Sequence, residues 1–262
     1  MSTAAVFRPV FSLAAPARWQ RLKALAALLC ADDAIIEQHE HSLHRLGVSY
    51  VDSLVIHDLD LGYGTREQVE GYLSELESGG RALAELRAAG TVKAFGAGCN
   101  MFSPEQQCDE FARRIAKIVD LDFYLIAGAH YTLLDQEALD VQMPIMDAND
   151  MTAVVGTPLA QGRLARGQFY GEDDLTPTAL KVQELQKVCE SEGVDIKAAA
   201  LQFPLAHPRV VSIIPGSANA EEAAENKALL DTDLPKNLWR KFKEAGLVRA
   251  EAPMPGDSNA SM

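Results

Sequence analysis

Five short apolar runs alternate with amphipathic segments along this chain of 262 residues. The first run, residues 50–56, is nearly continuous in Val, Leu and Ile, which is typical of a strand buried on both faces of a parallel sheet. It ends in His57 and Asp58. Polar residues at the C-terminal end of such a strand lie where α/β barrels place their chemistry. The alternation therefore predicts parallel βαβ units joined by right-handed crossovers.

The other elements follow from the same periodicities. The remaining strand-like runs are residues 93–98, 123–126, 152–155 and 210–214. The expected helices are residues 33–46, 67–89, 137–146, 177–192, 196–206, 220–230 and 235–245, with one more that opens at Ser103, Pro104 and Glu105. We expect the helix over residues 67–89 to break near Gly79 and Gly80, because glycine is a poor helix former.

Composition excludes several classes of protein. A hydrophobic content of 48% indicates a globular chain. The formal net charge of −13 argues against nucleic acid as a partner, since a phosphate backbone needs a basic surface. No apolar run is long enough to span a membrane. His41 and His44 lie three residues apart on a polar helix, which favours a solvated face, so we expect no metal site.

The cysteines indicate a reducing compartment. Cys30, Cys99, Cys108 and Cys189 form no CxxC pair and no disulfide framework, so we expect free thiols and a cytoplasmic location.

The two ends of the chain differ from its middle. Residues 1–31 contain four basic residues and no acidic one, which resembles a transit peptide for a mitochondrion or plastid. An amphipathic helix or an irregular extension explains the same composition. We therefore divide the chain into an extension (residues 1–32), an enzyme-like domain (residues 33–247) and a flexible tail (residues 248–262) that is rich in Pro, Gly, Ser and Asn.

Two loops near the last strands are suited to anions. Pro215, Gly216 and Ser217 form a turn that enters a helix, whose N-terminal N–H groups favour a phosphate. The loop over residues 156–164 adds glycines and, with the residue that follows shortly after it, two arginines, Arg163 and Arg166, which are suited to a pyrophosphate. Ordinary helix capping and an ordinary flexible loop are the alternatives. Side by side, the two loops match the usual phosphate location of (β/α)8 barrels.

At this point the chain resembles the aldo-keto reductases over residues 33–247. The segments that carry the resemblance are residues 42–47, 50–52, 56–58, 96–100, 158–164 and 214–216, followed by Glu225 and Asn226. Within the family, residues 124–139 resemble the branch of D-threo-aldose 1-dehydrogenase and pyridoxal 4-dehydrogenase. L-galactose dehydrogenase is a related alternative.

The resemblance implies a (β/α)8 TIM-barrel fold and reversible hydride transfer between a nicotinamide cofactor and the C1 of an aldose or another small carbonyl compound. The family uses a Tyr, a Lys, an Asp and a His. Tyrosine titrates near pH 10, so a neighbouring cation is needed to make it a usable proton donor. By resemblance, His57 is the catalytic residue that orients the carbonyl, and Asn100 contacts the nicotinamide carboxamide.

The cofactor's phosphate and adenosine side is assigned by the same resemblance. It corresponds to Leu159, Gln161, Gly162, Leu164, Gly216, Ser217, Asn219 and Asn226. A 2′-phosphate requires Arg or Lys on the last helix of this site. This chain instead offers Glu221 and Glu222, with no basic residue before Lys227. The cofactor is therefore NAD or NADP, with NAD preferred.

One departure from the family decides how far the resemblance extends. The family's Asp, Tyr and Lys precede its His, and residues 1–33 contain no strand-like segment that carries them. We therefore expect an incomplete barrel of about five of the eight βα units. Asp58 and Tyr63 imitate the family's Asp-to-Tyr spacing, but they follow His57 and have no partner lysine. Gly156 replaces the family's ring-stacking aromatic residue.

Three functions remain compatible with these observations. The first is an oxidoreductase of the aldose-dehydrogenase type, and the second is a catalytically inactive nucleotide-binding or regulatory protein. The third is an interaction fragment in which the strand before His57 is an open edge, because an unpaired edge invites association with another chain. The sequence leaves the specific sugar and the oligomeric state open.

Overall fold

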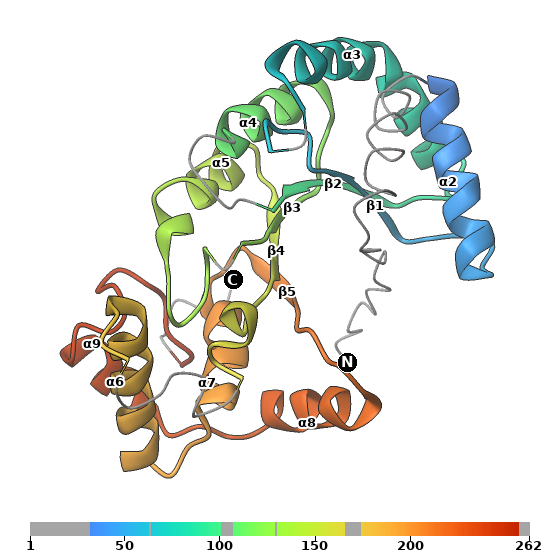
Figure 1. Cartoon of the computed structure of the whole chain (residues 1–262). Coiled ribbons are helices and arrows are strands. Elements are labelled where there is room, and N and C mark those ends of the chain that lie inside the picture. Colours follow the sequence, from blue (N-terminus) through green and yellow to red (C-terminus); the bar gives the residue numbers. More distant parts are fainter. Residues whose placement is uncertain (1–31, 63, 101–106, 129, 166–173, 257–262) are drawn as a thin grey trace. The chain divides into compact units, whose positions relative to one another are not determined.

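A computed structural model describes residues 32–62, 64–100, 107–128, 130–165 and 174–256. Helices and strands alternate along this part of the chain (Figure 1). The strands are β1 (Ser53–His57), β2 (Ala94–Cys99), β3 (Phe123–Ile126), β4 (Thr152–Gly156) and β5 (Val210–Ile214). The α-helices are α2 (Asp32–Leu46), α3 (Arg66–Ala88), α4 (Cys108–Ile118), α5 (Gln142–Ala148), α6 (Pro177–Ser191), α7 (Ile196–Gln202), α8 (Ala220–Leu230) and α9 (Lys236–Glu244).

The strands form one sheet in the order β1-β2-β3-β4-β5. Strand β4 pairs in parallel with β3 and with β5, and Phe123 lies opposite Thr152 in the first of these pairs. The expected α/β fold with a parallel sheet is therefore confirmed. Strands β1 and β5 are the two edges of the sheet, so the described strands do not close into a barrel.

The chain divides into two compact units. The first unit comprises residues 1–97 and 103–122, and the second comprises residues 98–102 and 123–262. In the first unit, Val69, Leu73 and Leu76 bury one face of α3. Thr65 caps this helix by accepting a hydrogen bond from the Gln68 backbone N–H, and the Gln68 side chain accepts one from the backbone N–H of Thr65.

Strand β1 is less buried than its apolar sequence predicts. Residues Ser53 to Ile56 are half-buried, and His57 is exposed. The prediction of a strand covered on both faces is therefore wrong for β1. The reason is that β1 is an edge strand of the described sheet, whereas Ala153, Val154 and Val155 of the central strand β4 are fully buried.

Two helix predictions were also wrong. Helix α3 runs without interruption through Gly79 and Gly80, because burial of its apolar face outweighs the low helix propensity of glycine. The helix predicted over residues 137–146 is instead a 3-10 turn (Glu137–Leu139) followed by α5. Pro144 explains the break, since it has no N–H to donate to the carbonyl of Asp140 and its ring would clash with that carbonyl.

The chain stays packed for several residues beyond the predicted start of a flexible tail. Val248, Ala252 and Met254 are buried. Arg249 donates to both carboxylate oxygens of Asp140, at 2.6 and 2.7 Å, and these bonds lower the pKa of Asp140. Residues 248–256 therefore belong to the second unit, because apolar burial and this bidentate ion pair hold them there.

Several other predictions concern residues outside the described ranges. These are the proposed transit segment (residues 1–31), the helix start at Ser103, the thiol of Cys30, Tyr63, and Arg166. Among described residues, Cys99, Cys108 and Cys189 are buried thiols that form no disulfide, as expected. None of the described helices combines the length and apolar character that crossing a bilayer requires.

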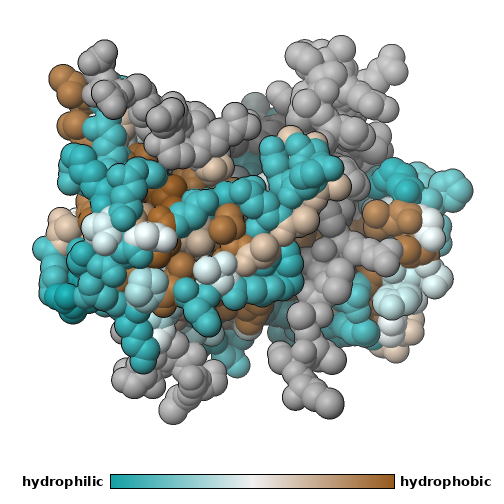
Figure 2. All heavy atoms as spheres, turned by 90° about the horizontal axis from the view of Figure 1, so that it is seen from below, coloured by the Kyte–Doolittle hydropathy of each residue, from teal (hydrophilic) through white to brown (hydrophobic). Residues whose placement is uncertain are grey.

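The surface of the described residues is mixed. On the face shown in Figure 2, hydrophilic side chains dominate and hydrophobic ones lie between them. The large hydrophobic residues that remain exposed are Tyr50, Leu175, Leu180, Leu205 and Val211. Val211 belongs to β5, whereas the edge predicted for an interaction fragment is β1, the strand that ends at His57 and forms the other edge of the described sheet.

Candidate functional site

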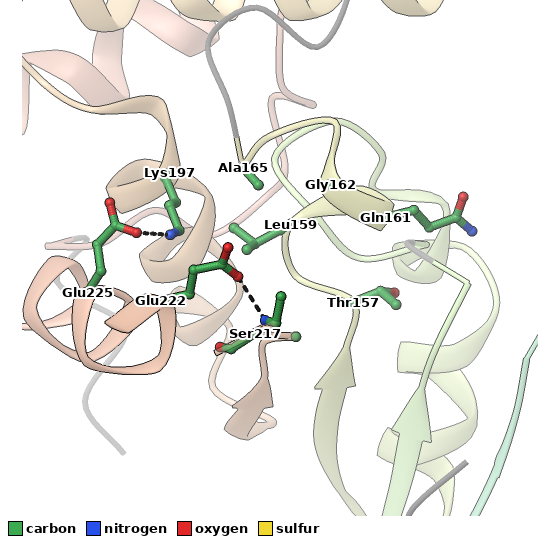
Figure 3. Close-up of a pocket in the computed structure, with 11 residues that line it drawn as sticks. Thr157, Leu159, Gln161, Gly162, Ala165, Lys197, Ser217, Glu222 and Glu225 are labelled. Carbon is green, nitrogen blue, oxygen red and sulfur yellow. Dashed lines mark hydrogen bonds and ion pairs between the residues drawn. The ribbon is translucent and has the colours of Figure 1, made fainter. Parts of the chain in front are cut away.

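A cavity of about 650 Å³ lies at the C-terminal ends of β4 and β5 in the second unit (Figure 3). Three segments line it: the loop after β4, the first turn of α7, and the turn that leads from β5 into α8. The lining residues are Thr157, Leu159, Gln161, Gly162, Ala165, Lys197, Gly216, Ser217, Ala218, Glu222 and Glu225. This position, beyond the carboxyl ends of parallel strands, is where α/β proteins commonly bind ligands.

The loop after β4 has a constrained backbone. Thr157, Ala160 and Gln161 have positive φ angles of 53°, 49° and 58°. Residues other than glycine rarely adopt this backbone conformation. Gly162 follows with a φ of 92°. The backbone N–H groups of Gly162 and Leu164 both bond to the carbonyl of Leu159. Strain of this kind concentrates at functional sites and persists only where surrounding contacts hold it.

The predicted residues of this loop have different positions. Leu159 and Gly162 line the cavity, whereas the Leu164 side chain is fully buried in the core and anchors the loop. In Figure 3 the side chain of Gln161 points away from Lys197. Its Oε1 accepts a hydrogen bond of 3.0 Å from Arg163 Nη1.

The turn after β5 is closed by its own helix. Asn219 is the N-cap of α8, and its Oδ1 accepts from the Glu222 backbone N–H at 2.8 Å. Glu222 Oε2 in return accepts from the Ala218 backbone N–H at 2.8 Å. A carboxylate therefore already occupies an amide that a phosphate would use, so this turn is less suited to a dianion than its Gly-Ser sequence predicts.

Asn226 supports the same turn from α8. Its side chain is buried, with 5% of its surface exposed. Its Nδ2 donates to the Gly216 carbonyl at 3.3 Å and to Ser217 Oγ at 2.9 Å. Its Oδ1 has no hydrogen-bond partner among the described residues. A buried acceptor without a partner is costly, and Asn226 supports the turn from behind without lining the cavity.

Lys197 is the cation of this cavity that the sequence did not reveal. Its side chain is 8% exposed, and its Nζ lies 2.5 Å from Glu225 Oε2 (Figure 3). It is the only cation among the described residues that line the cavity. The available signal was a single lysine in a mostly apolar helix, two residues after Asp195, which caps α7 by accepting from the Lys197 backbone N–H.

The cavity fits a nicotinamide dinucleotide in chemical terms. Glu222 and Glu225 offer acceptors for ribose hydroxyls and an exocyclic amine. For a pyrophosphate, the glycine-containing loop after β4 offers backbone approach, and Lys197, which it would share with Glu225, offers positive charge. The lining thus has the donors and acceptors that such a cofactor requires.

His57 ends β1 in the first unit. Its Nδ1 lies 3.0 Å from Asp58 Oδ1, and its side chain is 31% exposed. Asp58 has a φ of 61°, which turns its carboxylate back toward the imidazole. When Nδ1 donates to this carboxylate, Nε2 is the ring nitrogen left to face a ligand. The pair thus forms an oriented imidazole.

Asn100 follows the end of β2 in the second unit and is half-buried. Gly98 lets β2 approach β3 closely at this point, since a Cβ on Gly98 would lie 2.7 Å from Leu125 Cβ and 2.9 Å from the Leu125 carbonyl oxygen. The position of Asn100 therefore depends on a backbone contact that only glycine allows.

A Tyr, a Lys and an Asp do occur together in the first unit, but at the other end of the strands. Lys93 Nζ lies 2.8 Å from Asp52 Oδ1 and 5.8 Å from the centre of the Tyr50 ring. These residues precede β1 and β2, whereas His57 ends β1. At about 3.3 Å per residue, Tyr50 and His57 are roughly 20 Å apart along the strand. This cluster is a surface ion pair and cannot serve as a proton relay for His57.

Comparison with known proteins decides the family. Residues 29–246 match the Aldo/keto reductase family. This chain belongs to the aldo-keto reductase family. It is 32% identical to the pyridoxal 4-dehydrogenase of Microbacterium luteolum over 224 residues, which cover 82% of the chain and 63% of that relative. It is 29% identical to the D-threo-aldose 1-dehydrogenase of a Pseudomonas species over 221 residues, which cover 79% of the chain and 60% of that relative.

Solved structures agree on the fold. An aldo-keto reductase from Bacillus halodurans in its holo form aligns with a TM-score of 0.62 at 20% identity, over 84% of this chain and 68% of its own. The glycerol dehydrogenase of Gluconobacter oxydans aligns with a TM-score of 0.60 at 19% identity, over 87% and 68%. The aldo-keto reductase chain described here spans 63% and 60% of the lengths of the two dehydrogenases named first.

Proposed function

We propose that this aldo-keto reductase chain binds a nicotinamide dinucleotide in the cavity beyond β4 and β5 and takes part in oxidoreduction at the C1 of an aldose or at a similar small carbonyl. The observation that carries the proposal is the cavity itself, where a constrained loop, Lys197 and a row of acceptors converge. Members of the family use nicotinamide cofactors, and the two relatives with the highest identities quoted above are dehydrogenases of an aldose and of pyridoxal.

The residues divide the work in this proposal. A bound nicotinamide cofactor would supply the hydride chemistry. Lys197 and the loop from Thr157 to Ala165 would hold the pyrophosphate of this cofactor, and Asn100 would hold its carboxamide. Asp58 fixes the imidazole of His57 so that Nε2 donates to or accepts from the carbonyl or hydroxyl oxygen of the substrate.

Glu222 favours NAD over NADP in this proposal. Its carboxylate and that of Glu225 both line the cavity, and Lys197 is engaged by Glu225 at 2.5 Å. Ribose hydroxyls can donate hydrogen bonds to these carboxylates, whereas a 2′-phosphate is repelled by them.

A second candidate function is nucleotide binding without turnover. Residues 1–56 contain one tyrosine, Tyr50, and one lysine, Lys23. Tyr50 is exposed and lies at the far end of β1 from His57. Loss of a general acid or base lowers the reaction rate by about 10²–10⁴-fold. A chain without the family's Tyr and Lys proton relay would therefore retain cofactor binding and little catalytic activity.

Turnover assays separate the two candidates. The purified chain is supplied with NAD and with L-fucose, D-arabinose or L-galactose, and NADH formation is followed. If the chain is an enzyme, we expect His57→Gln to lower kcat/KM by roughly 10²-fold, as expected for loss of one group that stabilises charge on the reacting oxygen. The exposed His41→Gln is the matched control and should leave the rate unchanged.

Each outcome has a defined meaning. Turnover that depends on His57 supports the enzyme. Saturable NADH binding without turnover on any of these sugars supports the binding protein. Absence of both NADH binding and turnover contradicts both candidate functions.

A further inference from the structure

A second cavity, of about 430 Å³, lies beside the same loop in the second unit. Its volume is within the range of roughly 300–1,000 Å³ that is typical of small-molecule sites. The loop after β4 contributes Ala160 and Arg163 to it, whereas Gln161, Gly162 and Ala165 line the first cavity. The segment after β3 and the first turns of α6 complete the lining with Gly128, Thr132, Leu134, Asp135, Pro177, Thr178 and Lys181.

The central feature of this cavity is Lys181. Its side chain is partly buried, and it makes no hydrogen bond or ion pair to any residue within the described ranges. Burial lowers its pKa, and the charge of Asp135 opposes that shift only in part. Removing an ammonium group from water without a hydrogen-bond acceptor is unfavourable. An anion bound next to Lys181 in the cavity would therefore be stabilised.

Asp135 does not fill this role because it is engaged elsewhere. Its Oδ1 accepts from the Glu137 backbone N–H at 2.9 Å. Its Oδ2 lies 3.8 Å from His130 Nδ1. The carboxylate is therefore held toward its own turn, where it contributes long-range attraction to Lys181 but no direct contact.

Further positive charge faces the same cavity. Arg163 Nη1 donates to the Ala160 carbonyl at 3.3 Å and to Gln161 Oε1 at 3.0 Å, and these bonds help to hold the guanidinium in place. The N-terminus of α6, capped by Thr176, adds the positive end of a helix of 15 residues. The lining thus has two cations and one carboxylate, in a chain whose net charge is −13.

We propose that this second cavity binds the phosphate or carboxylate group of a small carbonyl compound or sugar, with Lys181 as its main contact and Arg163 as a second one. The proposal rests on the proposed function in one respect, namely that such a compound is the substrate. Gly128, at the end of β3, and the shared loop place this cavity at the same edge of the sheet as the nucleotide cavity. An anionic group bound there would anchor a substrate whose carbonyl extends toward that edge.

The test compares a sugar phosphate with its neutral sugar. D-arabinose 5-phosphate, D-arabinose and inorganic phosphate are titrated by calorimetry into the purified full-length chain, without nucleotide. We expect D-arabinose 5-phosphate to bind at least about tenfold more tightly than D-arabinose and to be displaced by inorganic phosphate. Lys181→Gln should remove this difference. Lys187→Gln is the matched control, since Lys187 lies on the same helix with 66% of its side chain exposed and should preserve the difference.

Equal binding of the two sugars by the unmodified chain overturns the proposal, and so does a preference for the phosphate that survives Lys181→Gln. If inorganic phosphate binds as tightly as the sugar phosphate, the cavity is an anion site without a sugar subsite, and the substrate part of the proposal fails. NADH binding is measured separately. Its absence together with an intact effect of Lys181 would reject the proposed function and keep the anion site.

Discussion

Glu222→Arg is expected to reverse cofactor preference, strengthening NADP binding at least about tenfold relative to NAD. In the unmodified protein, a 2′-phosphate near the turn after β5 meets the carboxylates of Glu222 and Glu225, and Lys197 is already bonded to Glu225. Arginine at position 222 replaces a repulsive charge with a planar group that binds phosphate through two hydrogen bonds. The measurement is a pair of titrations, with NADP and with NAD.

Two further variants isolate the cause. Glu221→Arg makes the same change in net charge on the neighbouring residue, which is exposed and does not line the cavity. We expect a much smaller change in preference, because exposed charges are screened by salt. Glu222→Gln keeps an acceptor for the Ala218 N–H and should give an intermediate preference. Equal effects of Glu221→Arg and Glu222→Arg, or tighter NADP than NAD binding by the unmodified chain, would contradict this account of Glu222.

Gly98→Ala is expected to destabilise the protein by about 3 kcal/mol, near the upper end of the usual range for overpacking. The new Cβ would lie 2.7 Å from Leu125 Cβ and 2.9 Å from the Leu125 carbonyl oxygen, so β3 itself would have to move. The measurement is urea denaturation of the variant and of the unmodified protein, which gives the difference in their free energies of unfolding. The affinity of the protein for the nicotinamide cofactor should weaken as well. Asn100, the proposed carboxamide contact, lies two residues after Gly98 and would be displaced with it.

Gly71→Ala provides the matched control for this experiment. Gly71 lies in α3, and no atom lies within 4 Å of a Cβ at that position. Alanine should therefore raise the free energy of unfolding by about 0.5–1 kcal/mol, the usual gain on replacing a helical glycine. A Gly98→Ala protein as stable as the unmodified chain would show that β2 and β3 do not pack as closely as described.

Local periodicity was enough to locate the strands. Each of the five apolar runs became a strand, because a buried parallel strand and its helical neighbours have distinct repeat patterns. The breaks were less predictable. Gly79 and Gly80 did not interrupt α3, since burial of its apolar face depends on partners remote in sequence. The effect of Pro144 on the helix over residues 137–146 was visible in the sequence and was missed.

The candidate site was predictable only where it follows strand ends. Leu159, Gly162, Gly216 and Ser217 lie directly after β4 or β5, and the structure groups them around one cavity. Lys197 comes from a helix between these strands, and its pairing with Glu225 joins residues 28 positions apart, which no local pattern encodes. The anion-facing position of Lys181 likewise depends on the segment after β3, far away in sequence.

The central claim is that the cavity beyond β4 and β5 holds the dinucleotide. Titrating NADH into the purified chain tests it, with Ala218→Trp to fill the cavity and Ala220→Trp as the control. Ala218 lines the cavity, whereas Ala220 begins α8, is exposed and does not line it. We predict saturable binding of one NADH. Ala218→Trp should weaken its affinity at least about tenfold, whereas Ala220→Trp should change the affinity by no more than about twofold. No NADH binding, or equal binding by the two tryptophan variants, would contradict the claim.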